Sequence, residues 1–194
     1  MGIILQIHYN TRVKGFLPGK EGIGEVFAYI SCKKSSGLTG FEEDMQMIAL
    51  ASDHTGIEMK NEIKKLLDEM GLEWKDFGTN ETVSCDYPIY GYRAAKAVAD
   101  GECDRGILIC GTGIGIGIAA SKVKGIRVCT CSDVYSAELS KRHNNSNILT
   151  MGARVVGADL AKMIATHWLT AEFEGGRHQR RVDMLTAIEN GEEL

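Results

Sequence analysis

Short apolar runs alternate with amphipathic stretches from residue 47 to the end of the chain. The apolar runs have the length and branched side chains of strands, and they cover 47–52, 73–77, 106–110, 125–133 and 147–157, the last including a loop. In the first stretch between them, apolar residues recur on one face at helical spacing: Ile57, Ile63, Leu66, Leu67 and Met70. Helices are predicted within 53–71, 88–100, after the glycine turn at 111–117, and over 133–145, 158–173 and 177–190.

Strands that alternate with helices at this spacing predict right-handed crossovers and a parallel sheet. Gly71 suits the end of the first helix, Pro88 the first turn of the second, and Asp133 a helix cap. The sequence therefore predicts an α/β protein, with a three-layer Rossmann-like fold around a five-stranded parallel sheet, over residues 47–194.

Residues 1–46 have a different character. Two short apolar runs are followed there by a linker-like stretch of glycine, serine and charged residues. We interpret 1–46 as an N-terminal extension of unassigned role: a partly disordered segment, a leader or an artefact.

Composition narrows the class of protein. The 194 residues are 44% hydrophobic and 25% charged, which is typical of a globular protein with a sizeable core. A formal net charge of −4 gives no support for binding nucleic acid or an anionic membrane, and no apolar stretch approaches the roughly 20 residues that span a bilayer. The cysteines show no zinc-like spacing and follow no export signal, so we expect reduced thiols in a cytoplasmic protein. They are Cys32, Cys85, Cys103, Cys110, Cys129 and Cys131.

The most distinctive stretch is GILICGTGIGIGIAAS at residues 106–121. A buried strand ends there in Cys110 and passes directly into alternating glycines and a helix of small residues. The unpaired N–H groups at a helix start, with the helix dipole, favour an anion. They also favour the thiolate form of a cysteine, so Cys110 is predicted to act as a base or nucleophile. The alternative is a buried cysteine that only packs.

Other polar residues follow the ends of predicted elements. Asp53 and His54 come after the first strand, His143 and Asn144 end the helix before the fifth strand, and Arg154 follows the fifth strand. We expect these side chains to gather around the glycine turn at the carboxyl edge, where open α/β sheets bind ligands. Singly, Asp53 is also a suitable helix cap, His54 an ordinary loop histidine, and His143 and Asn144 residues favoured at a helix end.

A second cluster, GGRHQRR, lies at residues 175–181. Arg177 and Arg181 share one face of a helix that begins after two glycines, and two guanidinium groups together suit a phosphate. A solvated basic face is the alternative. Because a long helix separates this cluster from the sheet, we expect it to reach the pocket of a neighbouring subunit.

Two other kinds of site find less support. The chain has no HxH, HExxH or grouped acidic triad, so proton chemistry without a metal is expected. Residues 115–120 fit GxGxxA and Asp133 ends the next strand, as in a dinucleotide site. However, that match begins several residues into the turn, and on the third strand.

Several long motifs occur in one order between residue 47 and about residue 189: ASDH, DYP, ILICGTGIGIGIAA, SAELSKRHNNSN, GARVVG and EGGRHQRR. On these motifs the chain resembles the ribose-5-phosphate isomerase B family, which includes galactose- and allose-phosphate isomerases. The resemblance implies an isomerase that interconverts ribose 5-phosphate and ribulose 5-phosphate through an enediolate, without metal or cofactor. A hexose 6-phosphate (allose or galactose) isomerase and a nucleotide-binding regulatory protein are the alternatives.

The resemblance also implies roles for single residues. Cys110 is the implied base that moves the proton between C1 and C2, and His143 the acid that opens the sugar ring, with Asp53 near the ring oxygen or hydroxyls. Backbone N–H groups of 111–115, helped by the Thr112 hydroxyl, are implied to stabilise the enediolate oxygen. The implied substrate contacts are Asp53, His54, Tyr87, Gly111, Thr112, Gly113, Ile114, Gly115, Asn144, Arg154, Arg177 and Arg181. A homodimer or homotetramer with its active site at the subunit interface is implied as well, the last two arginines coming from a partner.

Overall fold

The computed structural model describes residues 46–194, so nearly all of the predicted extension at 1–46 lies outside the described residues. The strands are β1 (Met47–Ser52), β2 (Glu73–Asp76), β3 (Arg105–Cys110), β4 (Val128–Thr130) and β5 (Ile148–Gly152). The helices are α2 (Ile57–Met70), α3 (Tyr87–Ala99), α4 (Ile114–Ala120), α5 (Val134–Asn144), α6 (Ala158–Thr170) and α7 (Arg177–Glu189). None of the helices in this part of the chain is long and apolar enough to cross a membrane.

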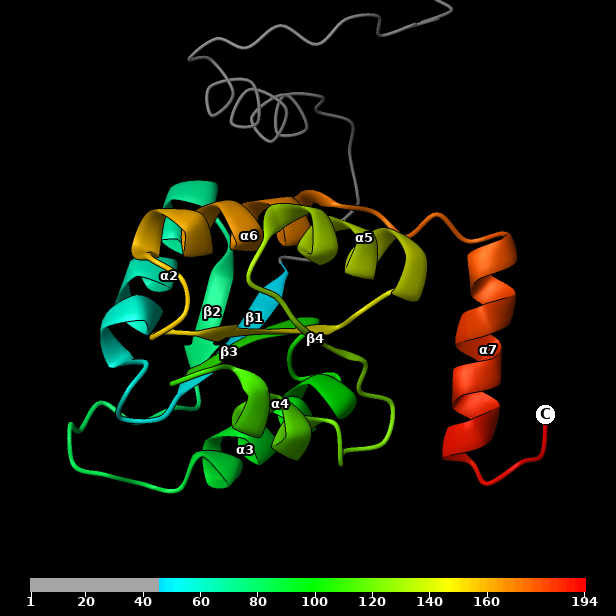
Figure 1. Ribbon diagram of the computed structural model, residues 1–194, viewed down its shortest axis with the longest axis horizontal. Helices are drawn as coiled ribbons and strands as arrows, with labels where there is room; N and C mark the ends of the chain where they lie inside the picture. The colour runs from blue at the N-terminus through cyan, green and yellow to red at the C-terminus, as the bar shows by residue number, and fades with distance from the viewer. Residues whose placement is uncertain (1–45) are drawn as a thin grey trace, which may run out of the picture. The chain divides into compact units, whose positions relative to one another are not determined.

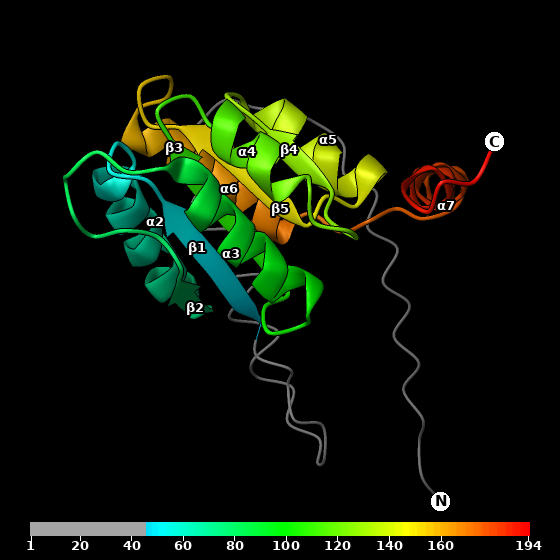
Figure 2. The ribbon, with the colours of Figure 1, turned by 90° about the horizontal axis from the view of Figure 1, so that it is seen from below.

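The five strands form one sheet in the order β2-β1-β3-β5-β4, and every neighbouring pair is parallel. Helices α2, α5 and α6 cover one face and α3 and α4 cover the other, while α7 stands to one side of these layers (Figures 1 and 2). The predicted three-layer α/β fold with a five-stranded parallel sheet is therefore confirmed.

Small residues bring the helices of one face close to the sheet. Ala49 and Ala51 of β1 pack in one cluster with alanines of α3, and the same cluster contains Leu108 and Cys110 of β3. Since alternate residues of a strand point to the same face, the Cys110 side chain points into the layer formed by α3 and α4.

Strand β4 is shorter than the predicted run at 125–133. Its ladder with β5 covers only Val128–Thr130, although Cys131 still donates its N–H to the Thr150 carbonyl at 3.0 Å. Asp133 then caps α5, as predicted: its side chain accepts from the Ser136 N–H at 2.7 Å.

The strand order places a switch point between β1 and β3. The chain leaves β1 for β2 on one side of it and returns to β3 on the other. In open α/β sheets, ligands bind beyond the carboxyl ends of the strands at such a point. Asp53 follows β1 there, and Cys110 ends β3.

Candidate functional site

The thiol of Cys110 lies beneath the first turn of α4. Its residue is only 4% exposed, and the Gly113 N–H donates to its Sγ at 3.2 Å. Gly113 has φ of +78°, and a Cβ there would lie 2.7 Å from the Met151 carbonyl carbon, so the turn requires glycine. The turn therefore places a backbone N–H donor directly on the Cys110 sulfur.

The glycine turn keeps fewer backbone donors for a ligand than the sequence predicts. The Gly113 N–H is taken up by the thiol, and the Ile114 N–H points to the hydroxyl of Thr112 at 3.4 Å. N–H groups in the first turn of an α-helix have no partner within the helix. The Gly115 N–H, within that first turn, is thus left for a ligand, in contrast to those of Gly113 and Ile114.

Asp53 is held by a tight turn of the β1–α2 connection. It is 5% exposed and accepts from the N–H and the hydroxyl of Thr55, at 2.9 and 2.6 Å. The N-cap of α2 is Gly56, with no side-chain cap, so the interpretation of Asp53 as a helix cap is wrong. A Cβ on Gly111 would lie 3.7 Å from the Thr55 hydroxyl and 3.8 Å from Arg154 Cδ, which places Arg154 beside this turn.

His54 and Tyr87 lie on the same edge of the sheet. The Cys85 N–H donates to His54 Nδ1 at 3.3 Å. Tyr87 begins α3, and its ring packs so tightly on Gly115 that a Cβ there would lie 2.7 Å from Tyr87 Cζ. We call the residues gathered at this end of the sheet the carboxyl-edge set: Asp53, His54, Tyr87, Cys110, Gly111, Thr112, Gly113, Ile114, Gly115 and Arg154.

His143 and Asn144 do not lie on this edge. They end α5, which runs back along the sheet, and shortly after them the Asn147 carbonyl accepts from the N–H of Gly106 near the start of β3. Gly106 and Cys110 are separated by four residues of strand, about 13 Å at about 3.3 Å per residue. The prediction that His143 and Asn144 gather around the glycine turn of their own chain is therefore wrong, because a crossover helix ends at the amino edge.

At the amino edge, His143 lies in a charged cluster between α5 and α7. Its ring stacks on that of His178, with centroids 4.2 Å apart and planes 2° from parallel. The Glu174 Oε2 atom lies 3.7 Å from His143 Nε2 and 3.6 Å from His178 Nε2. Arg142 binds the same carboxylate at 2.6 and 2.9 Å, and this hydrogen bond holds the pKa of Glu174 below its ordinary value.

Arg177 and Arg181 belong to the same end of the molecule. Arg177 Nε donates to His178 Nε2 at 3.3 Å, and burial, aided by the neighbouring His143 and Arg177, lowers the pKa of His178. At the far end of α7, the Glu189 carboxylate accepts from the Gly125 N–H at 2.9 Å. We call the second group the amino-edge set: Arg142, His143, Asn144, Glu174, Arg177, His178 and Arg181.

A cavity of about 360 Å³ opens beside Asn144. Its lining comes from residues 125–129, from the end of α5, and from Leu185, Thr186 and Glu189 of α7. It lies at the amino edge and does not include the thiol of Cys110.

The amino-edge set contains a group of possible metal ligands that the spacing in the sequence does not show. Atoms of His143, Glu174 and His178 lie within 4.8 Å of one another. Two guanidinium groups contact the same cluster, Arg142 on Glu174 and Arg177 on His178, and their charge opposes a divalent cation. The cluster suits an anion better than a metal ion, and the metal-free reaction stays a prediction.

The geometry gives no support to the dinucleotide alternative. Gly115 and Gly117 lie inside α4, where they allow close packing against Tyr87 and against the hydroxyls of Thr130 and Thr150. Asp133, the expected ribose ligand, caps α5 instead. These glycines therefore serve packing and do not form a phosphate loop.

Sequence reasoning assigned no role to Glu174, His178 or Cys85. Glu174 and His178 belong to the EGGRHQRR motif. Their closeness in sequence to the arginines of that motif could have indicated that they share a site. Cys85 contributes a backbone N–H, which no residue type reveals.

Comparisons with known proteins agree with this architecture. The family model described as Ribose/Galactose Isomerase matches residues 48–185. Ribose-5-phosphate isomerase B of Escherichia coli (strain K12) is 55% identical over 145 residues, which cover 75% of this chain and 97% of that protein. D-erythrulose-4-phosphate isomerase of Pectobacterium atrosepticum is 43% identical over 149 residues, covering 76% of this chain and 98% of that protein.

The fold of a solved relative matches as well. The structure of Clostridium thermocellum ribose-5-phosphate isomerase B superposes with a TM-score of 0.74 at 52% sequence identity, covering 75% of this chain and 99% of that one. With a family model over more than half of its length and relatives matched almost end to end, the chain belongs to the ribose/galactose isomerase family and is a sugar phosphate isomerase.

Proposed function

We propose that the chain interconverts ribose 5-phosphate and ribulose 5-phosphate through an enediolate, with the Cys110 thiolate as the base. The observation that carries this proposal is the Gly113 N–H directed at the Cys110 sulfur, at the switch point of the sheet and beside Asp53 and Arg154. The E. coli relative, named ribose-5-phosphate isomerase B, supports the pentose phosphate as substrate.

The isomerisation moves one proton from C2 to C1 of the substrate, and Cys110 carries it between them. The thiolate of Cys110 takes the proton from C2 of the open aldose, and the electrons move to the oxygen on C1, giving the enediolate. The Gly115 N–H and the Thr112 hydroxyl stabilise the developing negative charge. The C2 hydroxyl then passes its proton to the oxygen on C1, the electrons left on the C2 oxygen form the ketone, and the Cys110 thiol returns its proton to C1. A base of this kind contributes about 10²- to 10⁴-fold to the rate.

The amino-edge set supplies ring opening and phosphate binding. His143 gives a proton to the ring oxygen of the furanose, and Asn144 binds the sugar hydroxyls. Arg177 and Arg181, one helical turn apart on α7, hold the phosphate, which is remote from the reacting carbons and so positions the sugar without taking part in the chemistry.

Two copies of the chain make up a complete site. The support for this step is the length of β3 between the two sets, which keeps Cys110 and His143 of one copy apart. In a symmetric dimer the carboxyl-edge set of each copy faces the amino-edge set of the other, so that two equal sites form.

Exposed apolar side chains support such a contact. Helix α7 exposes Met184, Leu185 and Ile188 at 41%, 48% and 54%. The helices beside the carboxyl-edge set expose a second group, formed by Ile89 and Tyr92 of α3 and Ile114 and Ile118 of α4. Apolar surfaces next to both sets are typical of an interaction site, and pairing them would remove them from water.

The number of carbon atoms in the sugar substrate has a second candidate value. A relative with 43% identity is named D-erythrulose-4-phosphate isomerase, which favours a four-carbon substrate as the second candidate. A hexose 6-phosphate would need more room between Tyr87 and Asn144, which meet at one site only across two copies.

The deciding experiment is an isomerase assay on four-, five- and six-carbon sugar phosphates, including those of ribose, allose and galactose. The expected result is the highest kcat/KM for the pentose pair, with exchange of the C2 proton lost in Cys110→Ala and binding of the sugar retained. A higher kcat/KM for a four- or six-carbon sugar phosphate would contradict the pentose as substrate. Normal exchange of the C2 proton in Cys110→Ala would remove the thiol from the mechanism. Cys131→Ala, a buried cysteine directly after β4, which β5 separates from β3, is the matched control.

A further inference from the structure

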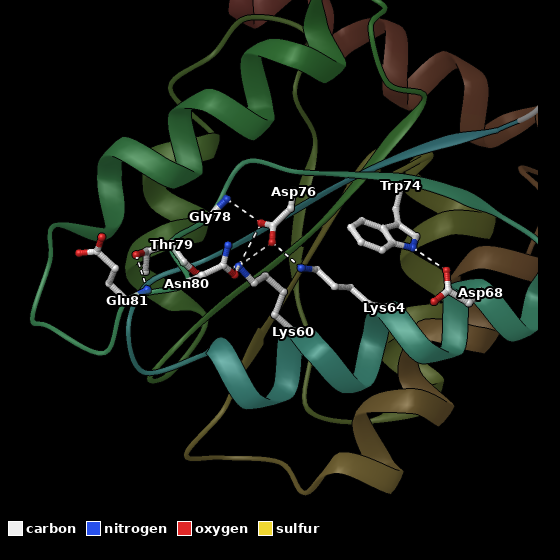
Figure 3. A network of polar contacts seen from close by, with 9 residues as sticks. All are labelled: Lys60, Lys64, Asp68, Trp74, Asp76, Gly78, Thr79, Asn80 and Glu81. Carbon is white, nitrogen blue, oxygen red and sulfur yellow. Dashed lines mark hydrogen bonds and ion pairs between the residues drawn. The ribbon is translucent and has the colours of Figure 1, made fainter.

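Lys60 is a buried cation that the mechanism does not use. It stands on α2 with a fully buried side chain, and its Nζ contacts Asp76 at 2.8 and 3.0 Å, the Thr79 carbonyl at 2.7 Å and the Asn80 side-chain oxygen at 3.1 Å (Figure 3). Removing an ammonium group from water is costly unless its partners compensate. Burial lowers the pKa of Lys60, while the hydrogen bond and the charge of Asp76 act against that shift.

Two partners of Lys60, Thr79 and Asn80, lie near the start of segment 77–86, which joins β2 to α3, and Asp76 ends β2 directly before it. Asp76 also accepts from the Gly78 N–H at 2.9 Å, and the Thr79 N–H donates to the Ser52 carbonyl at 3.0 Å. A Cβ on Gly78 would lie 2.3 Å from the Ser52 nitrogen. The start of the segment is therefore pressed onto the end of β1, directly before Asp53 and His54.

The other end of the same segment contacts two residues of the carboxyl-edge set. The Cys85 N–H donates to His54 Nδ1, and Tyr87 packs on Gly115. A ring nitrogen that accepts a hydrogen bond carries no proton, so the neutral imidazole of His54 keeps its proton on Nε2. Residues 81–84, between the two anchored ends, are exposed.

We propose that Lys60 is a positioning residue of the active site: it anchors segment 77–86 and so keeps His54 in the tautomer that donates from Nε2 and Tyr87 against Gly115. This inference rests on the proposed function and on the substrate contacts that the family resemblance implies for His54 and Tyr87. Lys60 acts through the segment and does not itself touch the sugar.

Lys64 provides the matched control. It binds the same carboxylate, with Nζ 2.6 Å from Asp76 Oδ2, and lies over the Trp74 ring, 4.8 Å from its centroid. Burial alone would raise the pKa of Asp76, but hydrogen bonds from Lys60, Lys64 and the Gly78 N–H hold that pKa below its ordinary value. Removing Lys64 weakens the ion pair on the solvent side and leaves the contacts of Lys60 with Thr79 and Asn80 in place.

The test compares Lys60→Met, Asn80→Ala and Lys64→Met in the full-length protein, by the ¹⁵N chemical shifts of the His54 ring and by KM and kcat for the preferred sugar phosphate. Lys60→Met is expected to mix the two His54 tautomers and to raise KM about tenfold or more, since small misplacements at a site have large effects. Asn80→Ala, an exposed residue, should change both in the same direction by less, and Lys64→Met should leave both near wild type.

Unchanged His54 shifts and unchanged KM in Lys60→Met overturn the proposal, and so does an equal effect in Lys64→Met. If Lys60→Met does not fold, Asn80→Ala decides in the same way. A wild-type protein that isomerises no sugar phosphate contradicts the proposed function alone, because the His54 shifts still report on the anchoring.

Discussion

The two sets of site residues are built from different materials. The carboxyl-edge set is placed by backbone turns at strand ends, with Cys110 and Asp53 at 4% and 5% exposure, and a Cβ on Gly113 or Gly115 would lie 2.7 Å from a neighbouring atom. The amino-edge set consists mainly of charged side chains on α5, on α7 and, for Glu174, on the connection before α7, with Arg142 and Glu174 at 43% and 37% side-chain exposure. The register of the sheet fixes the first set, whereas contacts between two helices hold the second.

The largest effect on activity is expected from variants that inactivate one of the two sets at a time. Cys110→Ala and His143→Ala should each lose about 10²- to 10⁴-fold in kcat. Dimers formed from both variants contain one intact site, so refolding an equal mixture should restore about a quarter of the wild-type activity. The measurement is the isomerase rate before and after mixing.

A second mixture serves as its control. Cys110→Ala with Asp53→Asn places both changes on the carboxyl edge, so no mixed dimer has an intact site and no recovery is expected. Equal recovery in both mixtures, or none in either, would contradict the assembly of the site from two copies.

The phosphate contacts give the next effect. Arg177→Ala and Arg181→Ala should raise KM about ten- to hundredfold, because each removes a charge-assisted hydrogen bond, and should change kcat much less. Arg180→Ala, an exposed arginine of the same helix, is the matched control. Steady-state kinetics on the phosphorylated sugar distinguishes the three variants, and a fall in kcat with unchanged KM would assign these arginines to the chemistry instead.

Buried charge at the amino edge predicts a smaller effect, on stability. Lys141 is 8% exposed and bonds the side-chain oxygen of Asn145 at 2.9 Å, and burial with Arg105 and Arg127 nearby lowers its pKa to about 8 from 10.5. Between those two pH values the unfolded chain binds more protons than the folded chain. Lys141 therefore increases the free energy of unfolding as pH rises from about 8 to 10.5, on the order of 1–3 kcal/mol.

The check is a pair of denaturation curves, measured across that pH range for wild type and Lys141→Met. The difference between the two proteins isolates the lysine from the other groups that titrate there. A difference in the free energy of unfolding that does not change with pH would show that folding does not lower the pKa of Lys141.

No effect at all is expected from removing metal ions. Exhaustive chelation should leave kcat/KM unchanged, because the guanidinium groups beside His143, Glu174 and His178 favour an anion over a cation. Loss of activity that is restored by adding a divalent metal ion would indicate that the amino-edge set binds a metal.

The carboxyl edge was the predictable half of the site. A buried run that ends in Cys110 and a glycine turn marks a strand end, and strand ends of a parallel sheet share one edge, so Asp53, His54 and Arg154 could be placed near it. The thiol–amide contact at Gly113 follows from φ at one residue, which sequence patterns do not specify.

The amino edge and the anchored segment were harder to predict. His143 and Asn144 were placed on the wrong edge because a helix end was treated like a strand end, although a crossover helix reverses direction. Lys60 looks like an ordinary polar position of an amphipathic helix, and 77–86 like a polar loop. Only the fold over the end of β1 turns that lysine into a buried cation.

The strand that separates Cys110 from His143 also has a consequence for dosage. If the catalytic unit is a pair of copies, a solitary chain turns over no substrate, and the rate per chain falls once the protein is diluted below its dissociation constant. Flux through the reaction then depends on the square of the protein concentration at low expression and on its first power at high expression. For such a pair, the length of one short strand would make the rate per chain fall in proportion to abundance below the dissociation constant.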